Sequence, residues 1–193
     1  KTPRRLMAYS SISHAGFLLT ALLAFGSGYT SSVLFYLTML LFVNFGIFLF
    51  LQLSEGEFRV SSLEDLGGLG RAYPYVGVMV VLYVLSLTGL PPLGGFTAKL
   101  LIFSNIWESY SLSNQNMLLV LLVAGILFTG VALFYYIKIP YYLFFKRNYI
   151  EDFLVISLSN KLLLALFALP LLVFFFKPDL LLNWIEQLLL QTF

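Results

Sequence analysis

Two ionisable side chains lie inside apolar stretches of this sequence, and they are the strongest candidates for chemistry. Lys99 is the only charged residue from Ala72 to Trp107. A lysine in the middle of a membrane span costs roughly 2.5 to 3.5 kcal/mol on insertion scales, so such residues mark ion or proton pathways. Burial and the positive N-terminal end of a helix beginning just before it both disfavour the ammonium form. We therefore predict that Lys99 exchanges protons. The alternative is a lysine that marks a helix end at the membrane surface.

His14 is the second candidate, in the first apolar stretch. Ser10 and Ser11 precede it by four and three residues, so a helix would place the three on one supporting polar face. An imidazole titrates near physiological pH and can relay protons through either nitrogen. The alternative is a histidine that is hydrogen-bonded to a neighbouring helix and inert.

Lys138 is a weaker candidate for a proton relay. It lies about 12 Å of helix before Lys146, which lets its side chain snorkel to the membrane surface. We favour snorkelling over a relay role. The Tyr135-Tyr136 and Tyr141-Tyr142 pairs are predicted to lie in an interfacial aromatic belt.

The composition limits which other chemistry the chain can perform. Of 193 residues, 60% are hydrophobic and 10% are charged, whereas soluble domains carry about a quarter charged residues. This excludes a soluble globular domain, a disordered chain and a nucleic-acid-binding protein. Cysteine is absent and histidine occurs once, which leaves little material for thiol chemistry, a metal site or a hydrolase triad. We expect a membrane protein without a metal or cofactor in this chain.

Five apolar stretches have roughly the length of a membrane-spanning helix, about 20 residues. They cover residues 6–25, 31–53, 75–106, 117–145 and 162–176, and the first ends at a Gly26-Ser27-Gly28 turn. None shows the alternating pattern of a membrane barrel. The prediction is an all-α, polytopic transmembrane helix bundle that forms one domain over residues 1–193.

The tail, residues 180–193, has apolar residues at helical spacing opposite a polar face. With Trp184 near one end, this pattern predicts a helix lying in the membrane interface, on lipid or on a partner subunit. The alternative is a frayed end of a span.

The third stretch contains a helix break. Gly89, Pro91, Pro92, Gly94 and Gly95 cannot all lie in a continuous helix, because proline removes hydrogen bonds and clashes with the preceding turn. The stretch is therefore either two full helices or one span broken near its middle.

The distribution of positive charge distinguishes these alternatives. If the stretch crosses once, nine basic residues share one side and only Lys177 lies on the other; two crossings give six against four. The nine are Lys1, Arg4, Arg5, Arg59, Arg71, Lys138, Lys146, Arg147 and Lys161. The positive-inside rule favours one discontinuous span, with residue 1 in the cytoplasm and the tail outside. Broken helices at mid-membrane are typical of ion transporters, so the residues alone indicate proton or cation movement.

Two motifs carry a family resemblance. Residues 4–16, RRLMAYSSISHAG, closely resemble the K-R-x-L-A-Y-S-S-I-x-H-x-G segment of the antiporter-like membrane subunits of respiratory complex I. Residues 86–99, SLTGLPPLGGFTAK, resemble the family's S-L-x-G-x-P-P-L-x-G-F-x-x-K segment. The resemblance extends over nearly the whole chain, including the aromatic segment 133–138.

This resemblance implies a subunit without a redox centre that moves protons when quinone reduction elsewhere in the complex supplies energy. It places the counterparts of Lys99 and His14 on a hydrophilic axis within the membrane. Arg4 stands where the family often has lysine; arginine keeps its proton, so its role would be electrostatic. The alternative, with similar motifs, is a subunit of a multi-subunit cation/proton antiporter.

The resemblance also implies the surroundings of the chain. The expected partners are the other membrane subunits of complex I and the lipid bilayer, with quinone met only through the whole complex. The expected location is the bacterial inner (plasma) membrane, crossed several times. The chain is expected to be the C-terminal part of a longer subunit.

Overall fold

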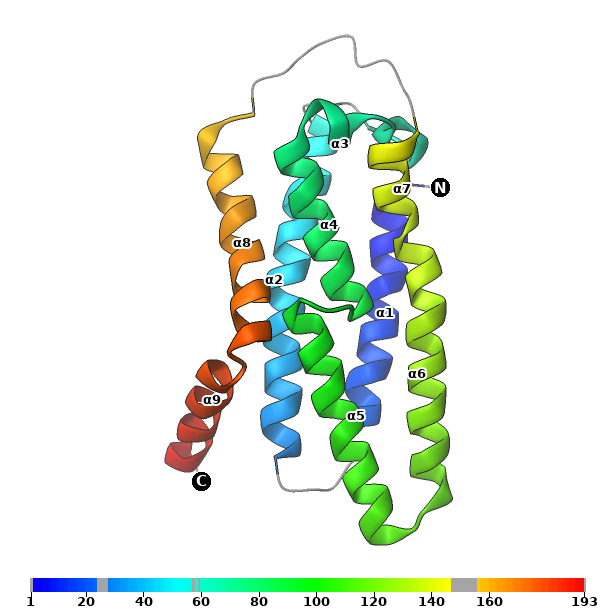
Figure 1. Cartoon of the computed structure of the whole chain (residues 1–193), viewed down its shortest axis with the longest axis vertical. Coiled ribbons are helices and arrows are strands. Elements are labelled where there is room, and N and C mark those ends of the chain that lie inside the picture. Colours follow the sequence, from blue (N-terminus) through cyan, green and yellow to red (C-terminus); the bar gives the residue numbers. More distant parts are fainter. Residues whose placement is uncertain (1, 24–27, 57, 59, 147–155, 193) are drawn as a thin grey trace.

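The computed structural model describes residues 2–23, 28–56, 58, 60–146 and 156–192, and every regular element among them is helical (Figure 1). The longer helices are α1 (Pro3–Ala21), α2 (Tyr29–Gly56), α4 (Pro74–Thr88), α5 (Gly94–Ser113), α6 (Asn116–Tyr136) and α8 (Leu158–Phe176). Shorter ones are the 3-10 helix η1 (Glu64–Leu66), α3 (Leu69–Ala72), α7 (Lys138–Phe145) and α9 (Asp179–Thr192). The predicted all-α fold is confirmed.

The helices form five roughly antiparallel rods: α1, α2, α4 followed by α5, α6 with α7, and α8 (Figure 1). Within the described residues, three helical stretches are long and apolar enough to span a membrane on their own: α2, Asn116–Phe145 and α8. A fourth passes if Glu64–Ala72 and Pro74–Thr88, bent by 117°, count as one span. α1 and α5 are long enough but not apolar enough, because α1 begins with Arg4 and Arg5 and α5 contains Asn105 and Glu108 besides Lys99. The five predicted apolar stretches lie in these rods.

The break in the third rod lies where the sequence predicts it. α4 ends at Thr88, and Gly89 follows with φ 76°, a left-handed conformation that suits glycine. α5 begins at Gly94 and continues below α4 in the same direction (Figure 1). The structure therefore contains one discontinuous rod and not a hairpin of two full helices.

The fourth predicted stretch is not a single helix. α6 ends at Tyr136 and α7 begins at Lys138. Pro140 has no N–H to donate to the carbonyl of Tyr136, four residues earlier, so the helix is interrupted there. The predicted stretch over residues 117–145 is confirmed as one candidate span, Asn116–Phe145, and the turn at Ile137 within it was not predicted.

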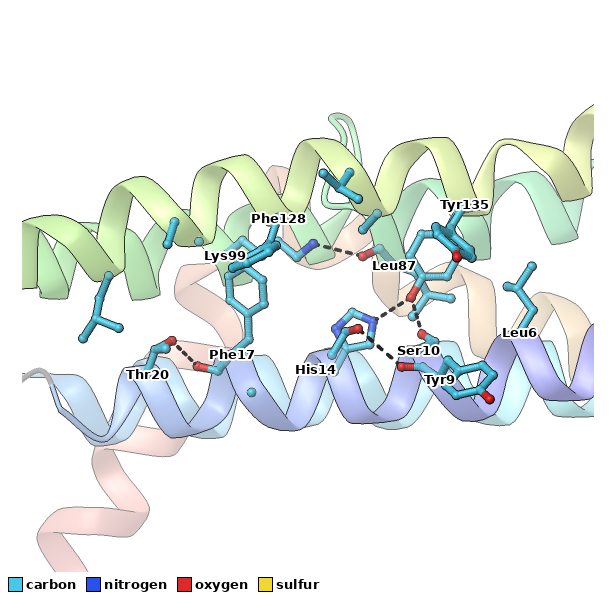
Figure 2. A pocket seen from close by; sticks show the side chains of 18 residues that line it. Leu6, Tyr9, Ser10, His14, Phe17, Thr20, Leu87, Lys99, Phe128 and Tyr135 are labelled. Atoms are coloured by element: carbon cyan, nitrogen blue, oxygen red, sulfur yellow. Dashed lines mark hydrogen bonds between the residues drawn. The ribbon is translucent and has the colours of Figure 1, made fainter.

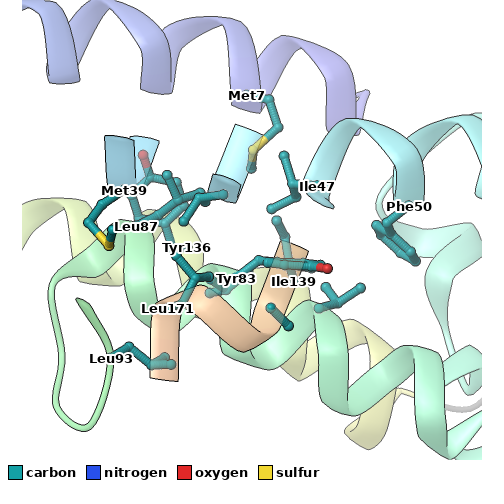
Figure 3. Packing of buried hydrophobic residues seen from close by; sticks show 14 of the residues in the cluster. Met7, Met39, Ile47, Phe50, Tyr83, Leu87, Leu93, Tyr136, Ile139 and Leu171 are labelled. Atoms are coloured by element: carbon teal, nitrogen blue, oxygen red, sulfur yellow. The ribbon is translucent and has the colours of Figure 1, made fainter. Parts of the chain in front are cut away.

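The core lies among α2, α4, α5 and α8. Figure 3 shows Met39, Ile47, Tyr83 and Leu171 packed together there. Tyr75 and Tyr83 of α4 donate hydrogen bonds to main-chain carbonyls of α8, those of Lys161 and Leu164. Both contacts join α4 to α8.

α1 and α6 lie at the opposite edge of the bundle. In the most apolar 18-residue window of Asn116–Phe145 only 6% of the residues are buried, and Ile12 and Leu127 are among the exposed side chains. This edge therefore presents a large apolar surface. The predicted turn at Gly26 and Ser27, after α1, lies outside the described residues.

The tail is helical, as predicted. Leu181 and Ile185 of α9 are buried, whereas Leu180 and Trp184 are exposed. α9 leans away from the end of α8 along the lower half of α2 (Figure 1). Its position in a membrane interface stays a prediction.

Candidate functional site

His14 lies at the centre of a buried hydrogen-bonded chain that joins three helices. Its Nδ1 is 2.7 Å from the hydroxyl oxygen of Tyr36 on α2, and its Nε2 is 3.4 Å from that of Tyr136 at the end of α6. The Tyr136 hydroxyl also shares a hydrogen bond with the Ser10 hydroxyl, one turn before His14 on α1. Only 6% of His14 is exposed. Both ring nitrogens therefore face groups that can donate or accept a hydrogen bond.

Lys99 lies in the second turn of α5 and reaches back to α4. Its Nζ donates hydrogen bonds to the carbonyls of Leu87, at 3.1 Å, and Thr88, at 2.8 Å. Only 5% of the residue is exposed. In a continuous helix these carbonyls would accept from residues 91 and 92, but both are prolines without an N–H. The lysine thus supplies the two hydrogen bonds that Pro91 and Pro92 cannot.

Two groups next to Lys99 interact favourably with a positive charge, although the residue itself is buried. The C-terminal end of α4 carries the negative end of the helix dipole, and the Phe17 ring centroid lies 5.2 Å from Nζ, within the range of a cation–π contact. From the sequence, the ammonium is expected to lie against the positive start of the helix that follows the break. The structure instead directs it to the carbonyl end of α4, because the side chain extends back across the break.

The start of α5 is fixed to α4 by a second contact. The main-chain N–H of Gly95 donates to the Ser86 hydroxyl at 3.2 Å. A Cβ at Gly95 would overlap the Ser86 carbonyl oxygen, so only glycine allows the two half-helices to approach this closely. Gly95 and Lys99, on one face of α5, together set the geometry of the break.

A cavity of about 480 Å³ opens between α1 and α6 and brings the two candidates together (Figure 2). Lys99, His14 and Ser10 line it, with Phe17 and Tyr136. A second, smaller cavity of about 10 Å³ is lined by His14, Tyr36, Ser86 and Lys99 among others, and this is close to the lower limit for one water molecule. His14 and Lys99 thus border the same two cavities.

The other predicted residues lie away from this cluster. Ser11 is exposed, and its hydroxyl donates to the Met7 carbonyl of its own helix, so Ser10 alone supports His14. Arg4 forms an ion pair with Glu55, 2.5 Å between Nη2 and Oε2, at the end of the bundle. Lys138 is exposed, with Nζ 5.2 Å from the Tyr135 ring centroid. This position agrees with snorkelling.

The sequence did not point to the two tyrosines. Tyr136 was assigned to an aromatic belt, yet it is 4% exposed and bonded to Ser10. Tyr135, its neighbour, is exposed as a belt residue would be. Tyr36 lies in the apolar stretch 31–53, which contains no charged residue, and nothing in its type or spacing distinguishes it there. Hydropathy cannot separate a buried phenol from an interfacial one, because both have the same composition and differ only in which helix face packs inward.

Within the described ranges, no group of three or more His, Cys, Asp or Glu side chains lies together, so we identify no metal-ligand set there. The cluster consists instead of one lysine, one histidine and hydroxyl groups beside enclosed space. Such an arrangement can hold, accept and pass protons.

The comparisons with known proteins now give the family. Residues 2–129 match the family model described as NADH:quinone oxidoreductase/Mrp antiporter, TM. The chain belongs to this family. Both sequence motifs and both residues of the candidate site, His14 and Lys99, fall within the matched region.

Relatives and a solved structure agree with the NADH:quinone oxidoreductase/Mrp antiporter assignment. The chain is 36% identical over 171 residues to NADH-quinone oxidoreductase subunit N 2 of Chloroherpeton thalassium, covering 86% of this chain and 32% of that protein. It is 35% identical over 147 residues to subunit N of Chlorobium chlorochromatii, covering 76% and 28%. A chain in respiratory complex I from Thermus thermophilus with bound aureothin matches with a TM-score of 0.73 and 29% identity, over 95% of this chain and 40% of that chain. The chain therefore spans about a third of the length of these relatives.

Proposed function

We propose that this chain is part of a proton-translocating membrane subunit of an NADH-quinone oxidoreductase, and that Lys99 and His14 relay the protons. The observation that carries the proposal is the position of Lys99. It is a buried lysine at a helix break, bonded to main-chain carbonyls and bordering the same cavities as His14. The relatives of this chain bear the name of that oxidoreductase.

In this function the chain contributes no redox step. Electron transfer and quinone reduction occur elsewhere in the complex, and the other membrane subunits and lipid surround this one. Uptake of a proton by neutral Lys99 creates an ammonium that the α4 carbonyls hold, and release returns the neutral amine. His14 connects this exchange to the remainder of the longer subunit. The location that fits is the bacterial inner membrane.

The test is quinone-linked proton pumping by the complete complex carrying Lys99→Ala in the full-length subunit, reconstituted in vesicles. We expect proton pumping to fall by roughly tenfold or more, as when a proton-transfer group is removed from an enzyme. Lys99→Arg is expected to fail as well, because arginine keeps its proton. Lys161→Ala, at the start of α8, is the matched control and should pump normally. Unimpaired pumping by a normally assembled Lys99→Ala complex would overturn the proposal.

A cation/proton antiporter is the second candidate, because the description of the matched family includes Mrp antiporters. Copurification separates the two. Isolation of the full-length subunit together with redox subunits supports the oxidoreductase, whereas isolation with other antiporter subunits and a sodium-dependent proton flux supports the antiporter.

A further inference from the structure

We propose that Tyr36 and Tyr136 are proton-relay residues on either side of His14, forming with Ser10 a hydrogen-bonded path from the small cavity beside Lys99 to the Ser10 side of the large cavity. This inference rests on the proposed function and deepens it, since it assigns the groups through which the proton moves. Tyr36 comes from α2, Tyr136 from the end of α6, and Ser10 and His14 from α1 (Figure 2 shows Ser10 and His14).

The contacts form a continuous series. Tyr36 Oη lies 2.7 Å from His14 Nδ1, His14 Nε2 lies 3.4 Å from Tyr136 Oη, and Tyr136 Oη is bonded to Ser10 Oγ. Tyr36 is 2% exposed and Tyr136 is 4% exposed. Little of either side chain is therefore exposed, and the two hydroxyls are the partners of both imidazole nitrogens.

The imidazole and the two phenol hydroxyls can pass a proton in either direction, but in only one direction at a time. A neutral imidazole has one N–H donor and one acceptor nitrogen, whereas each hydroxyl can do either. In one tautomer Tyr36 donates to Nδ1 and Nε2–H donates to Tyr136. In the other tautomer both hydrogen bonds are reversed. The histidine can therefore pass a proton without leaving either nitrogen unpaired.

The proton balance is as follows. The Lys99 ammonium gives a proton to the Tyr36 oxygen through one water molecule in the small cavity that both residues border, while Tyr36 gives its own proton to His14 Nδ1. The proton on Nε2 goes to the Tyr136 oxygen, Tyr136 gives its own to Ser10, and Ser10 releases one to water in the large cavity. One proton enters and one leaves, no group is oxidised or reduced, and Lys99 is left as a neutral amine. Rotation of the hydroxyls and return of the imidazole tautomer reset the path.

The two ends of the path are placed for this role. At one end the small cavity is bordered by Tyr36, His14 and Lys99. The Phe17 ring contacts both neighbours, with its centroid 6.4 Å from that of Tyr36 and 5.2 Å from Lys99 Nζ. At the other end Ser10 and Tyr136 border the large cavity between α1 and α6. The path thus leads from the small cavity beside Lys99 to Ser10 and Tyr136 at the large cavity, which Lys99 also borders.

The test uses Tyr36→Phe and Tyr136→Phe in the full-length subunit of the complete complex. Each change removes one hydroxyl and keeps the ring, and we expect proton pumping to fall by roughly tenfold. Because the two hydroxyls act in series, the double variant should pump protons no more slowly than the slower of the two single variants. Tyr83→Phe is the matched control: Tyr83 is also buried, but its hydroxyl donates to the Leu164 carbonyl, so pumping should be unchanged.

A second measurement separates a relay from a purely structural role. A fluorinated tyrosine at position 36 or 136 keeps the shape and the hydrogen bond but makes the phenol more acidic. A relay predicts a changed pumping rate and a changed solvent deuterium isotope effect, whereas an anchoring role predicts neither. This variant also replaces any Phe variant that does not assemble.

The outcomes distinguish this inference from the proposed function. If Lys99→Ala impairs pumping while both Phe variants and both fluorotyrosine variants match the unmodified complex, the tyrosine path is overturned and the proposed function stands. If Lys99→Ala pumps normally, the proposed function itself is wrong. Loss of pumping in assembled Phe variants, with a shifted isotope effect on fluorination, supports the path.

Discussion

Asp65 is an example of a single side chain that organises a loop at the end of the bundle. One of its carboxylate oxygens accepts hydrogen bonds from the main-chain N–H groups of Ser61, at 2.9 Å, and Ser62, at 2.7 Å, and from the Ser61 hydroxyl at 2.8 Å. Such bonds favour the charged form, and they lower the pKa of Asp65 from 3.8 to about 2. Ser61 and Ser62, just before η1, are therefore held by one charge.

This charge predicts a pH dependence of the loop. Because the pKa in the folded state lies below the unfolded value, the stabilisation is fully present above about pH 4 and is lost as the pH falls towards 2. The side chain is largely exposed, so screening limits the effect to below about 1 kcal/mol. Hydrogen exchange should show protection of the Ser61 and Ser62 amides that declines over this interval. Asp65→Asn should remove both the protection and its pH dependence; an unchanged exchange profile in that variant would contradict the assignment.

The sequence identified the two ionisable members of the site but not the hydroxyl groups. Lys99 and His14 stand out because charge and imidazole are rare in apolar segments. Tyr36 and Tyr136 do not stand out, because a tyrosine is common in such segments and its hydroxyl has a role only when a particular partner faces it. Which partner faces it depends on the rotation of α2 and α6 relative to α1, and that rotation is set by packing over many residues.

The broken rod, α4 and α5, depends on glycine at two positions, of which Gly89 gives the sharper test. Its φ of 76° is one that other residues adopt only with strain, and a Cβ there would lie 2.6 Å from Lys99 Cδ. Gly89→Ala is expected to destabilise the subunit by about 1 to 2 kcal/mol from the left-handed conformation. It should also displace the Lys99 side chain from the α4 carbonyls.

Thermal unfolding and proton pumping of the assembled complex check this expectation together. Both should fall in Gly89→Ala. Gly130→Ala in α6 is the control, because a Cβ there has no heavy atom within 4 Å and alanine favours helix. If Gly89→Ala behaved like Gly130→Ala, the left-handed turn would not be essential to the break.

Helix existence was predictable, but helix ends were less so. The break at residues 89–95 and the tail helix both follow from proline, glycine and apolar spacing. The end of α6 at Tyr136 was missed, because the apolar pattern continues through Pro140 and hydropathy does not register a missing N–H. α8 begins at Leu158, four residues before the predicted start, since the Ser157 hydroxyl accepts a hydrogen bond from the Asn160 N–H and caps the helix.

The two ends of the whole molecule differ, because α4 and α5 form one discontinuous rod. α4 and α5 run in one direction (Figure 1), so the loop before α4 and the turn after α5 lie at opposite ends of the bundle. Arg71 and Lys161 lie towards the first end, and Lys177 follows the opposite end of α8. The charge distribution used to predict a single crossing therefore agrees with the arrangement of the helices.

Labelling of single cysteines tests this topology, and the chain has no native cysteine to interfere. Ser62→Cys and Gln115→Cys in a cysteine-free full-length subunit should react with an impermeant maleimide from opposite sides of the membrane. Ser62→Cys should react in inside-out vesicles and Gln115→Cys in right-side-out vesicles. Reaction of both from the same side would mean two crossings, and the broken rod would then be a hairpin.

The pairing of Lys99 with two prolines has a consequence for the way the lysine can discharge. An ammonium has three N–H groups, and a neutral amine keeps two of them together with one lone pair. The carbonyls of Leu87 and Thr88 require two donors, which is the number that survives deprotonation. The lysine can therefore lose its charge while both carbonyls remain hydrogen-bonded. The contacts that join α4 to α5 use two of its N–H groups, so the third can release its proton.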